Sequence, residues 1–104
     1  MILRGHLYWV SLDKRRPALV VSPDYRNERA SDVIVVPATS RLRPSPTRVL
    51  LSKGEAGLPH ASALNAEQIA TLAVVEIEEE LGALSEARMG DVERAILRAI
   101  GIAL

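Results

Sequence analysis

The fold of this chain is decided by residues 17–22, which read Pro17-Ala18-Leu19-Val20-Val21-Ser22. The run is almost continuously apolar, and prolines bound it on both sides. A strand with one solvent-exposed face alternates apolar and polar residues, whereas an unbroken apolar run of this length is typical of a strand buried on both faces. We therefore predict such a buried strand here.

Further strands are predicted on either side of this run. Residues 6–12 are rich in aromatic and β-branched types, and residues 33–36 form a third strand that Pro37 should end or place at an edge. Shorter strands are expected at 48–51, 62–64 and 68–72, while 74–80 fits either a strand or a short helix. The segments between them are predicted as a polar loop at 23–32, an extended proline-stiffened loop at 41–46 and a turn at 54–59.

One helix is predicted at the end of the chain. Ser85 is a suitable N-cap, and Glu86 in the first turn favours the helix dipole. An apolar stripe at helical spacing follows, formed by Met89, Val92, Ile96, Ala99 and Ala103, and Gly101 should loosen or end the helix. Several short strands before one terminal helix indicate an α+β fold, a small β-barrel or twisted antiparallel sheet with a C-terminal α-helix packed on it.

Composition narrows the class of protein. A chain of 104 residues fits a single domain, 1–104, and its 48% hydrophobic content is that of a globular protein. It has no cysteine for a disulfide or a thiolate metal site, and two histidines cannot alone build a structural zinc site. No apolar run is long enough to cross a membrane, and no secretory signal is visible, so we expect a soluble cytoplasmic protein.

The zero net charge conceals two halves of opposite sign. Residues 1–54 hold ten basic and four acidic side chains, a net charge of +6, and residues 55–104 hold three basic and nine acidic ones, a net charge of −6. A basic half can attract a polyanion such as nucleic acid, although each half can equally be a solvated surface.

Groups suited to RNA cleavage stand at predicted strand ends. Lys14-Arg15-Arg16 opens the second strand, Thr39-Ser40-Arg41 closes the third, and Glu67-Gln68 opens a later one. Cleavage of RNA without a metal needs an acceptor for the 2′-OH proton, a stabiliser of the phosphorane charge and a donor to the leaving 5′ oxygen. Arginine suits the second task but is a poor base. Taken singly, each residue also has an ordinary role as a charged strand start, a turn cap or an edge amide.

Other polar residues carry weaker signals. His6 begins a strand and is expected to be a hydrogen-bonded surface residue, whereas His60 follows a Gly-Leu-Pro turn and is a minor candidate for a ligand contact. Glu78-Glu79-Glu80 has the carboxylates of a magnesium site, but adjacent positions diverge, which favours a solvated face. Tyr25 could stack a base if its loop reaches the site.

Five segments follow one another with plausible gaps: Arg4-Gly5, Arg16-Pro17-Ala18-Leu19-Val20-Val21-Ser22, Val36-Pro37-Ala38-Thr39-Ser40, the run from Ser62 to Thr71, and Gly82-Ala83-Leu84-Ser85 before a helix with Met89. Their order and spacing resemble the MazF/PemK (Kid-like) toxins of type II toxin–antitoxin pairs. The resemblance covers nearly the whole chain. It implies a homodimeric SH3-like barrel with a C-terminal helix and no cofactor or metal. It also implies a sequence-specific, metal-independent endoribonuclease that cuts single-stranded mRNA to 2′,3′-cyclic phosphate and 5′-hydroxyl ends.

The resemblance also implies roles for residues and partners. Arg16 matches the catalytic arginine, Thr39 the catalytic threonine, and Glu67 an acidic position implicated as the base. RNA-binding positions are expected at Lys14, Arg15, Ser40, Arg41, Arg43 and Gln68. A MazE-like antitoxin is the expected protein partner, covering the RNA groove with an acidic, apolar segment, and operator DNA would be reached through the antitoxin complex.

Three departures from the family pattern bear on mechanism and specificity. Gly5-His6 stands where many members have Gly-Asp, and only Asp13-Lys14-Arg15 joins the first two strands, where a longer loop is common. Asn65 occupies the position of the Kid branch's catalytic arginine, which favours Arg16 with Thr39 as the chemical pair. Two alternatives stay open: a CcdB-like toxin that binds a topoisomerase without cutting, whose Trp-Gly-Ile ending this chain lacks, or an inactive homologue that binds antitoxin and operator DNA.

Overall fold

Antiparallel strands are the main regular elements of the computed structural model, which describes residues 1–103. The strands are β1 (His6–Ser11), β2 (Arg15–Val20), β3 (Asp32–Thr39), β4 (Arg48–Leu51), β5 (Ser62–Asn65), β6 (Ala70–Ala73) and β7 (Ile77–Ala83). The helices are α1 (Asp24–Asn27) and α2 (Glu86–Ala99), and three 3₁₀ turns are η1 (Glu55–Gly57), η2 (Ala66–Gln68) and η3 (Val74–Glu76). Leu104, the last residue of the predicted domain, lies outside the described residues.

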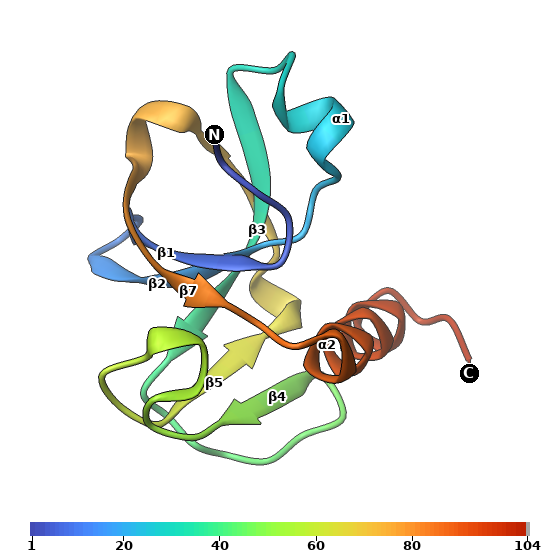
Figure 1. Ribbon diagram of the computed structural model, residues 1–104. Helices are drawn as coiled ribbons and strands as arrows, with labels where there is room; N and C mark the ends of the chain where they lie inside the picture. Colours follow the sequence, from blue (N-terminus) through green and yellow to red (C-terminus); the bar gives the residue numbers. More distant parts are fainter. Residues whose placement is uncertain (104) are drawn as a thin grey trace.

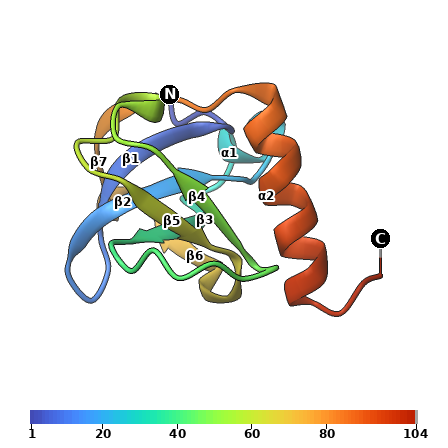
Figure 2. The ribbon, with the colours of Figure 1, turned by 90° about the horizontal axis from the view of Figure 1, so that it is seen from below.

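The strands form one twisted sheet in the order β4-β5-β3-β2-β1-β7, and β6 pairs with β3 beside this path. The predicted α+β class, antiparallel sheet and C-terminal helix are confirmed. The sheet does not close into a complete barrel, because β4 and β7 end the strand path without pairing to each other. Helix α2 runs along one side of the sheet next to β4 (Figures 1 and 2).

Two apolar cores lie on opposite sides of β2. Leu19 belongs to the larger core, which includes Val92 and Ala95 of α2, whereas Ala18 and Val20 belong to a smaller core. Successive side chains of a strand point to opposite faces. The alternation confirms that the apolar run of residues 17–22 contains a strand buried on both faces.

Pro37 lies inside β3 and does not end it, and the alternative prediction of an edge position holds only locally, on one side of β3. It pairs with Ala18 of β2, and on the other side of β3 the partner strands leave a gap at this point. There, β6 pairs with residues 32–35 and β5 with residues 38–39. A proline can be tolerated at such a gap, because it cannot donate a ladder hydrogen bond.

Other predicted boundaries shift by a few residues. The loop at 23–32 contains α1, and Gln68 lies in η2 because β6 begins only at Ala70. The ambiguous segment 74–80 contains both η3 and the start of β7. Strand β2 spans residues 15–20, where residues 17–22 were predicted, and β3 extends to Thr39. Strand β4 agrees with the predicted residues 48–51.

Helix α2 begins and ends where the sequence indicates. The Ser85 side chain accepts a hydrogen bond from the Arg88 backbone N–H at 3.2 Å, and Gly101 follows the helix with φ of 83°. A left-handed residue after the last turn favours glycine. The predicted stripe packs on the larger core through Met89, Val92, Ile96 and Ala99, whereas Ala103 is exposed beyond the helix.

Candidate active site

The pairing of β2 with β3 brings Arg16 and Thr39 to the same end of the sheet. The strands pair Val20 with Val35, Leu19 with Val36 and Ala18 with Pro37. The ladder ends at Ala18 and Pro37, so Arg16 and Thr39 each lie two residues beyond it, on neighbouring strands. Residues 23 positions apart in the sequence therefore come to the same end of the sheet.

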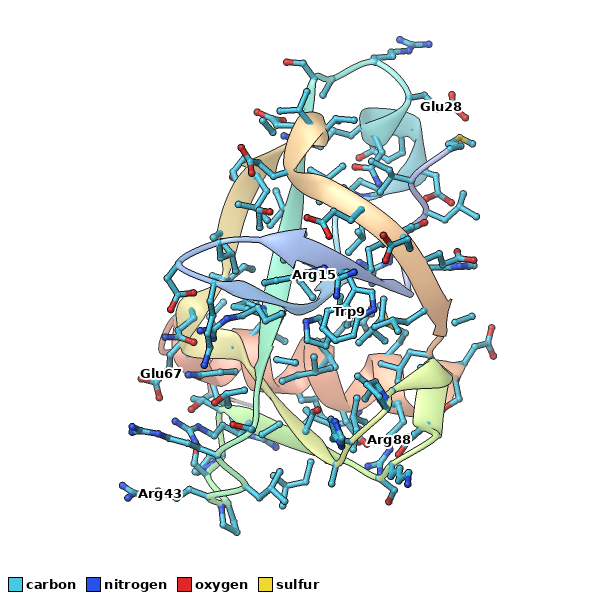
Figure 3. The ribbon with its side chains drawn as sticks, turned by 90° about the vertical axis from the view of Figure 1, so that its left-hand side faces the viewer. Trp9, Arg15, Glu28, Arg43, Glu67 and Arg88 are labelled. Carbon is cyan, nitrogen blue, oxygen red and sulfur yellow. The ribbon has the colours of Figure 1, made fainter. Side chains whose placement is uncertain are left out.

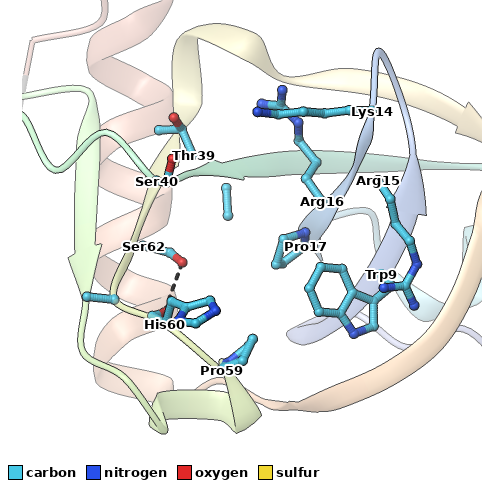
Figure 4. Close-up of a pocket in the computed structure, with 12 residues that line it drawn as sticks. Trp9, Lys14, Arg15, Arg16, Pro17, Thr39, Ser40, Pro59, His60 and Ser62 are labelled. Atoms are coloured by element: carbon cyan, nitrogen blue, oxygen red, sulfur yellow. Dashed lines mark hydrogen bonds between the residues drawn. The ribbon is translucent and has the colours of Figure 1, made fainter.

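A cleft of about 200 Å³ lies at this end of the sheet and contains both residues. Four segments line it: β1 through Trp9, the start of β2, the end of β3 and the segment that leads into β5 (Figure 4). The lining residues are Trp9, Lys14, Arg15, Arg16, Pro17, Ala38, Thr39, Ser40, Pro59, His60, Ala61 and Ser62. Of the predicted site residues, Lys14, Arg15, Arg16, Thr39 and Ser40 are thus brought together.

The Arg16 guanidinium is only partly engaged. Its side chain is 14% exposed and donates from Nη2 to the carboxylate of Asp13 at 2.8 Å. Its Nε is shielded from solvent and has no acceptor among residues 1–103. The side chain also borders a second hollow together with Asp13, Pro37 and Gln68. An arginine with unused donors in a cleft is suited to binding phosphate oxygens.

The Thr39 hydroxyl can still donate a hydrogen bond. Its Oγ1 accepts from the backbone N–H of Arg41 at 3.2 Å, which turns the chain at the end of β3. A hydroxyl carries one hydrogen besides its acceptor sites, and that hydrogen is not required by this contact. Thr39 is half-buried, so its hydroxyl is held at the cleft wall.

Arg15 is much more firmly held than Arg16. It lies over the Trp9 ring, 4.3 Å from the ring centroid (Figure 3), and donates to Glu78 at 2.7 Å and to Glu79 at 2.6 Å. The hydrogen bond from Arg15 lowers the pKa of the Glu78 carboxyl and raises the pKa of Arg15 itself. Arg15 therefore joins β2 to β7 as well as bordering the cleft.

Glu67 and Gln68 lie on η2, beside the cleft and not in its lining. The Glu67 carboxylate accepts from the Thr47 hydroxyl at 2.6 Å and faces a separate hollow next to Arg98 and Ile100 of the helix end. Gln68 borders the hollow beside Arg16. The structure thus separates Glu67 from the pair Arg16 and Thr39, while the adjacent Gln68 lies close to Arg16.

Arg41 and Arg43 are exposed on the β3–β4 loop, outside the cleft lining. Neither they nor Lys14 form an ion pair within the described part of the chain. Tyr25 is 76% exposed on α1 and does not line the cleft. The side chains of Lys14, Arg41 and Arg43 are therefore available to bind an anion.

The segment 59–62 contributes cleft residues that the sequence barely indicated. Strand pairing of Thr39 with Ala63 carries Pro59, His60 and Ser62 to the cleft. No short motif joins this segment to β2 or β3. The one sequence signal was a histidine after a Gly-Leu-Pro turn, and Trp9 was assigned only to a strand.

The opposite charges of the two halves meet in ion pairs. Arg4 binds Glu93, Arg15 binds Glu78 and Glu79, and His6 binds Glu80 through Nδ1 at 2.5 Å. His6 is therefore the hydrogen-bonded residue that was expected, and the three glutamates each have a basic partner. No cluster of three or more potential metal ligands occurs among residues 1–103. In the same residues, no helix is long and apolar enough to cross a membrane.

Comparison with known proteins shows the class of protein to which this open antiparallel sheet with a flanking helix belongs. Residues 3–100 match the family described as PemK-like, MazF-like toxin of type II toxin–antitoxin system. The chain belongs to this family.

Named relatives and solved structures support the same assignment. The chain is 31% identical to the probable endoribonuclease MazF5 of Mycobacterium tuberculosis, over 97% of this chain and 91% of that protein. It is 33% identical to endoribonuclease MazF1 of Mycobacterium bovis, over 96% and 93%. An endoribonuclease in complex with its cognate antitoxin, from a mycobacterial species, matches with a TM-score of 0.88 and 31% identity over 100% and 99% of the chains. MazE–MazF from Deinococcus radiodurans matches with a TM-score of 0.80 and 27% identity over 98% and 97%.

The chain is therefore a MazF-like toxin of the endoribonuclease class. Neither the topoisomerase-binding alternative nor the inactive homologue gains support from these relatives.

Proposed function

We propose that this toxin cleaves single-stranded mRNA in the cleft between β2 and β3, leaving 2′,3′-cyclic phosphate and 5′-hydroxyl ends without a metal. The observation that carries the proposal is the presence of Arg16 and Thr39 in the lining of one cleft. A phosphodiester there meets a guanidinium whose one ion pair is with the exposed Asp13, and a hydroxyl with a free hydrogen.

In this mechanism, Arg16 and Thr39 stabilise the phosphorane. Negative charge grows on the equatorial oxygens as the 2′ oxygen attacks, and donors already in position stabilise the transition state more than the ground state. Arg16 supplies a fixed positive charge, and Thr39 supplies a neutral donor from the neighbouring strand. Arg16 is held in place by pairing with Val10 of β1, and Thr39 by pairing with Ala63 of β5.

Glu67 has a positioning role in this proposal. Its carboxylate holds the Thr47 hydroxyl, and the same turn presents Gln68 to the hollow beside Arg16. Removal of the carboxylate would loosen η2 and, through it, the wall beside Arg16.

RNA affinity comes from cationic side chains around the cleft. Lys14, Arg15, Arg41 and Arg43 would contact backbone phosphates, and Ser40 and Gln68 would contact the nucleotides next to the scissile bond. Phosphate contacts provide affinity, while base contacts select the sequence. The same basic surface suits an acidic MazE-like antitoxin segment, as expected for a relative of a toxin solved with its cognate antitoxin.

The proposed assembly is a cytoplasmic homodimer that binds operator DNA only through its antitoxin. Operator binding would then require the antitoxin, so the toxin alone should not shift an operator fragment in a gel.

The test is incubation of the purified protein with end-labelled single-stranded RNA in EDTA, followed by end-mapping. We expect discrete cuts with cyclic phosphate ends, whereas intact RNA together with topoisomerase inhibition would overturn the proposal. Loss of cleavage in EDTA with recovery on adding Mg²⁺ would overturn the metal-independent mechanism.

A further inference from the structure

The cleft that contains Arg16 and Thr39 is rich in proton donors and poor in proton acceptors. Its charged side chains are Lys14, Arg15 and Arg16, which only donate at neutral pH. No carboxylate lines the cleft within residues 1–103, and Glu67 faces a separate hollow. The proposed reaction nevertheless needs an acceptor for the proton of the 2′-OH.

His60 is the lining residue that can serve as this acceptor. The hydroxyls of Thr39, Ser40 and Ser62 are too weakly basic, whereas imidazole exchanges a proton near neutral pH. His60 is exposed at the cleft, on the wall formed by residues 59–62 (Figure 4). Its ring forms no hydrogen bond with any other described residue, so both nitrogens are available.

The backbone at His60 is held in place independently of its ring. The Ser62 hydroxyl donates to the His60 carbonyl oxygen at 3.1 Å, immediately before β5 pairs with the end of β3. The wall that carries His60 is thus tied to the strand that carries Thr39. Backbone anchoring leaves the imidazole free to meet a substrate.

We propose, on the basis of the proposed function, that His60 is the general base of the cleavage reaction. Its imidazole takes the 2′-OH proton while the 2′ oxygen forms a bond to phosphorus and the bond from phosphorus to the 5′ oxygen breaks. Water or the Lys14 ammonium gives a proton to the leaving 5′ oxygen. The reaction is an internal transesterification, so no other reactant is needed.

The first experiment measures kcat and KM for a labelled single-stranded RNA from about pH 5 to about pH 9. We expect His60→Ala to lower kcat by about 10²- to 10⁴-fold, with a smaller change in KM, and to remove the rise of the rate with pH. Added imidazole should restore part of the lost activity. Circular dichroism and thermal unfolding of the variant report whether it folds.

His6→Gln is the matched control, because His6 is paired with Glu80 outside the cleft. It should keep the wild-type rate and pH profile. If His60→Ala keeps them too, the assignment is overturned.

The second experiment replaces the 5′ bridging oxygen of the substrate with sulfur, because a thiolate leaves without being protonated. A variant that lacks the base stays slow on this substrate. If His60→Ala cleaves it at the wild-type rate, His60 is the acid and the proposal is overturned. Cleavage that depends on Arg16 but not on His60 overturns this inference alone, whereas a wild-type protein that cuts no RNA overturns the proposed function.

Discussion

Arg15 and Arg16 are adjacent in the sequence, but the structure surrounds them differently. Arg15 stacks on Trp9 and binds Glu78 and Glu79, so its donors are largely occupied by the protein. Arg16 has one ion pair, with the exposed Asp13, and a shielded Nε without an acceptor among the described residues. Both border the same cleft.

The difference shows that a basic run is not a uniform binding surface. Successive side chains of a strand point to opposite faces, so Arg15 reaches the carboxylates of β7 and Arg16 reaches the hollow beside Gln68. An occupied guanidinium must give up protein contacts before it binds phosphate, whereas a partly engaged one can bind directly. We therefore expect Arg16 to dominate chemistry and Arg15 to contribute mainly to structure.

Between the two arginines, the larger expected effect is that of Arg16→Ala. Loss of its guanidinium should lower single-turnover cleavage by about 10²- to 10³-fold, because a positioned donor to the developing charge is removed. Arg15→Ala is the matched variant and should reduce cleavage only a few-fold, by about 2 to 5 times. Equal losses of cleavage rate in Arg16→Ala and Arg15→Ala would contradict the proposed difference in role between the two arginines.

Thr39→Val should have the next largest effect. The substitution removes the donor while it keeps the branched shape, and a hydrogen bond to a charged group is worth about 10- to 100-fold in rate. Thr39→Ser retains the hydroxyl and should stay close to the wild-type rate in the same assay. A serine variant as slow as the valine variant would assign Thr39 a packing role.

Glu67→Gln should reduce kcat by less than about fivefold, because its carboxylate acts through η2 and does not line the cleft. Thr47→Val, which removes its hydrogen-bond partner, should have an effect of similar size. A loss comparable to that of Arg16→Ala would instead show that Glu67 reaches the reacting atoms in the RNA complex.

The smallest effect concerns stability in acid. Hydrogen bonding to Arg15 lowers the pKa of Glu78, and hydrogen bonding to Arg88 lowers the pKa of Glu55. A carboxyl whose pKa is lower in the folded state stabilises the fold above its unfolded pKa of about 4.3, and this stabilisation disappears as the pH falls through the folded value.

Arg15→Gln should therefore lose stability less steeply than the wild type as the pH falls below about 4.3, in urea unfolding. Arg88→Gln should give the same change through Glu55 and serves as the control far from the cleft. A wild-type slope in Arg15→Gln would show that the bridge to β7 contributes nothing in solution.

Local patterns were sufficient for most of the elements. The apolar run at residues 17–22, the strand at residues 48–51 and the Ser85 cap each depend on neighbours within a few positions and were recognised, although β2 spans residues 15–20 and not 17–22. The prediction that Pro37 ends its strand was wrong, because β3 continues through a position that β5 and β6 leave unpaired on one side. That gap is a property of the assembled sheet.

The candidate site was only partly visible in the sequence. Arg16 and Thr39 were found through a family resemblance and meet in one cleft, whereas Glu67 faces another hollow. His60 carried little signal, because only the pairing of β5 with β3 brings it to the cleft.

By itself, the sequence determined the α+β class, the buried strand, the terminal helix and the toxin family. The spacing of apolar residues reflects which side chains are buried, and the order of the motifs reflects common ancestry. The tertiary structure alone decided that Arg15 is bound by two protein carboxylates, that Arg16 has a single exposed partner, and that His60 lines the same cleft. Those outcomes depend on strand register and on acceptors more than 40 residues away. These partners are brought together only when the strands pack in three dimensions, so no short stretch of sequence predicts them.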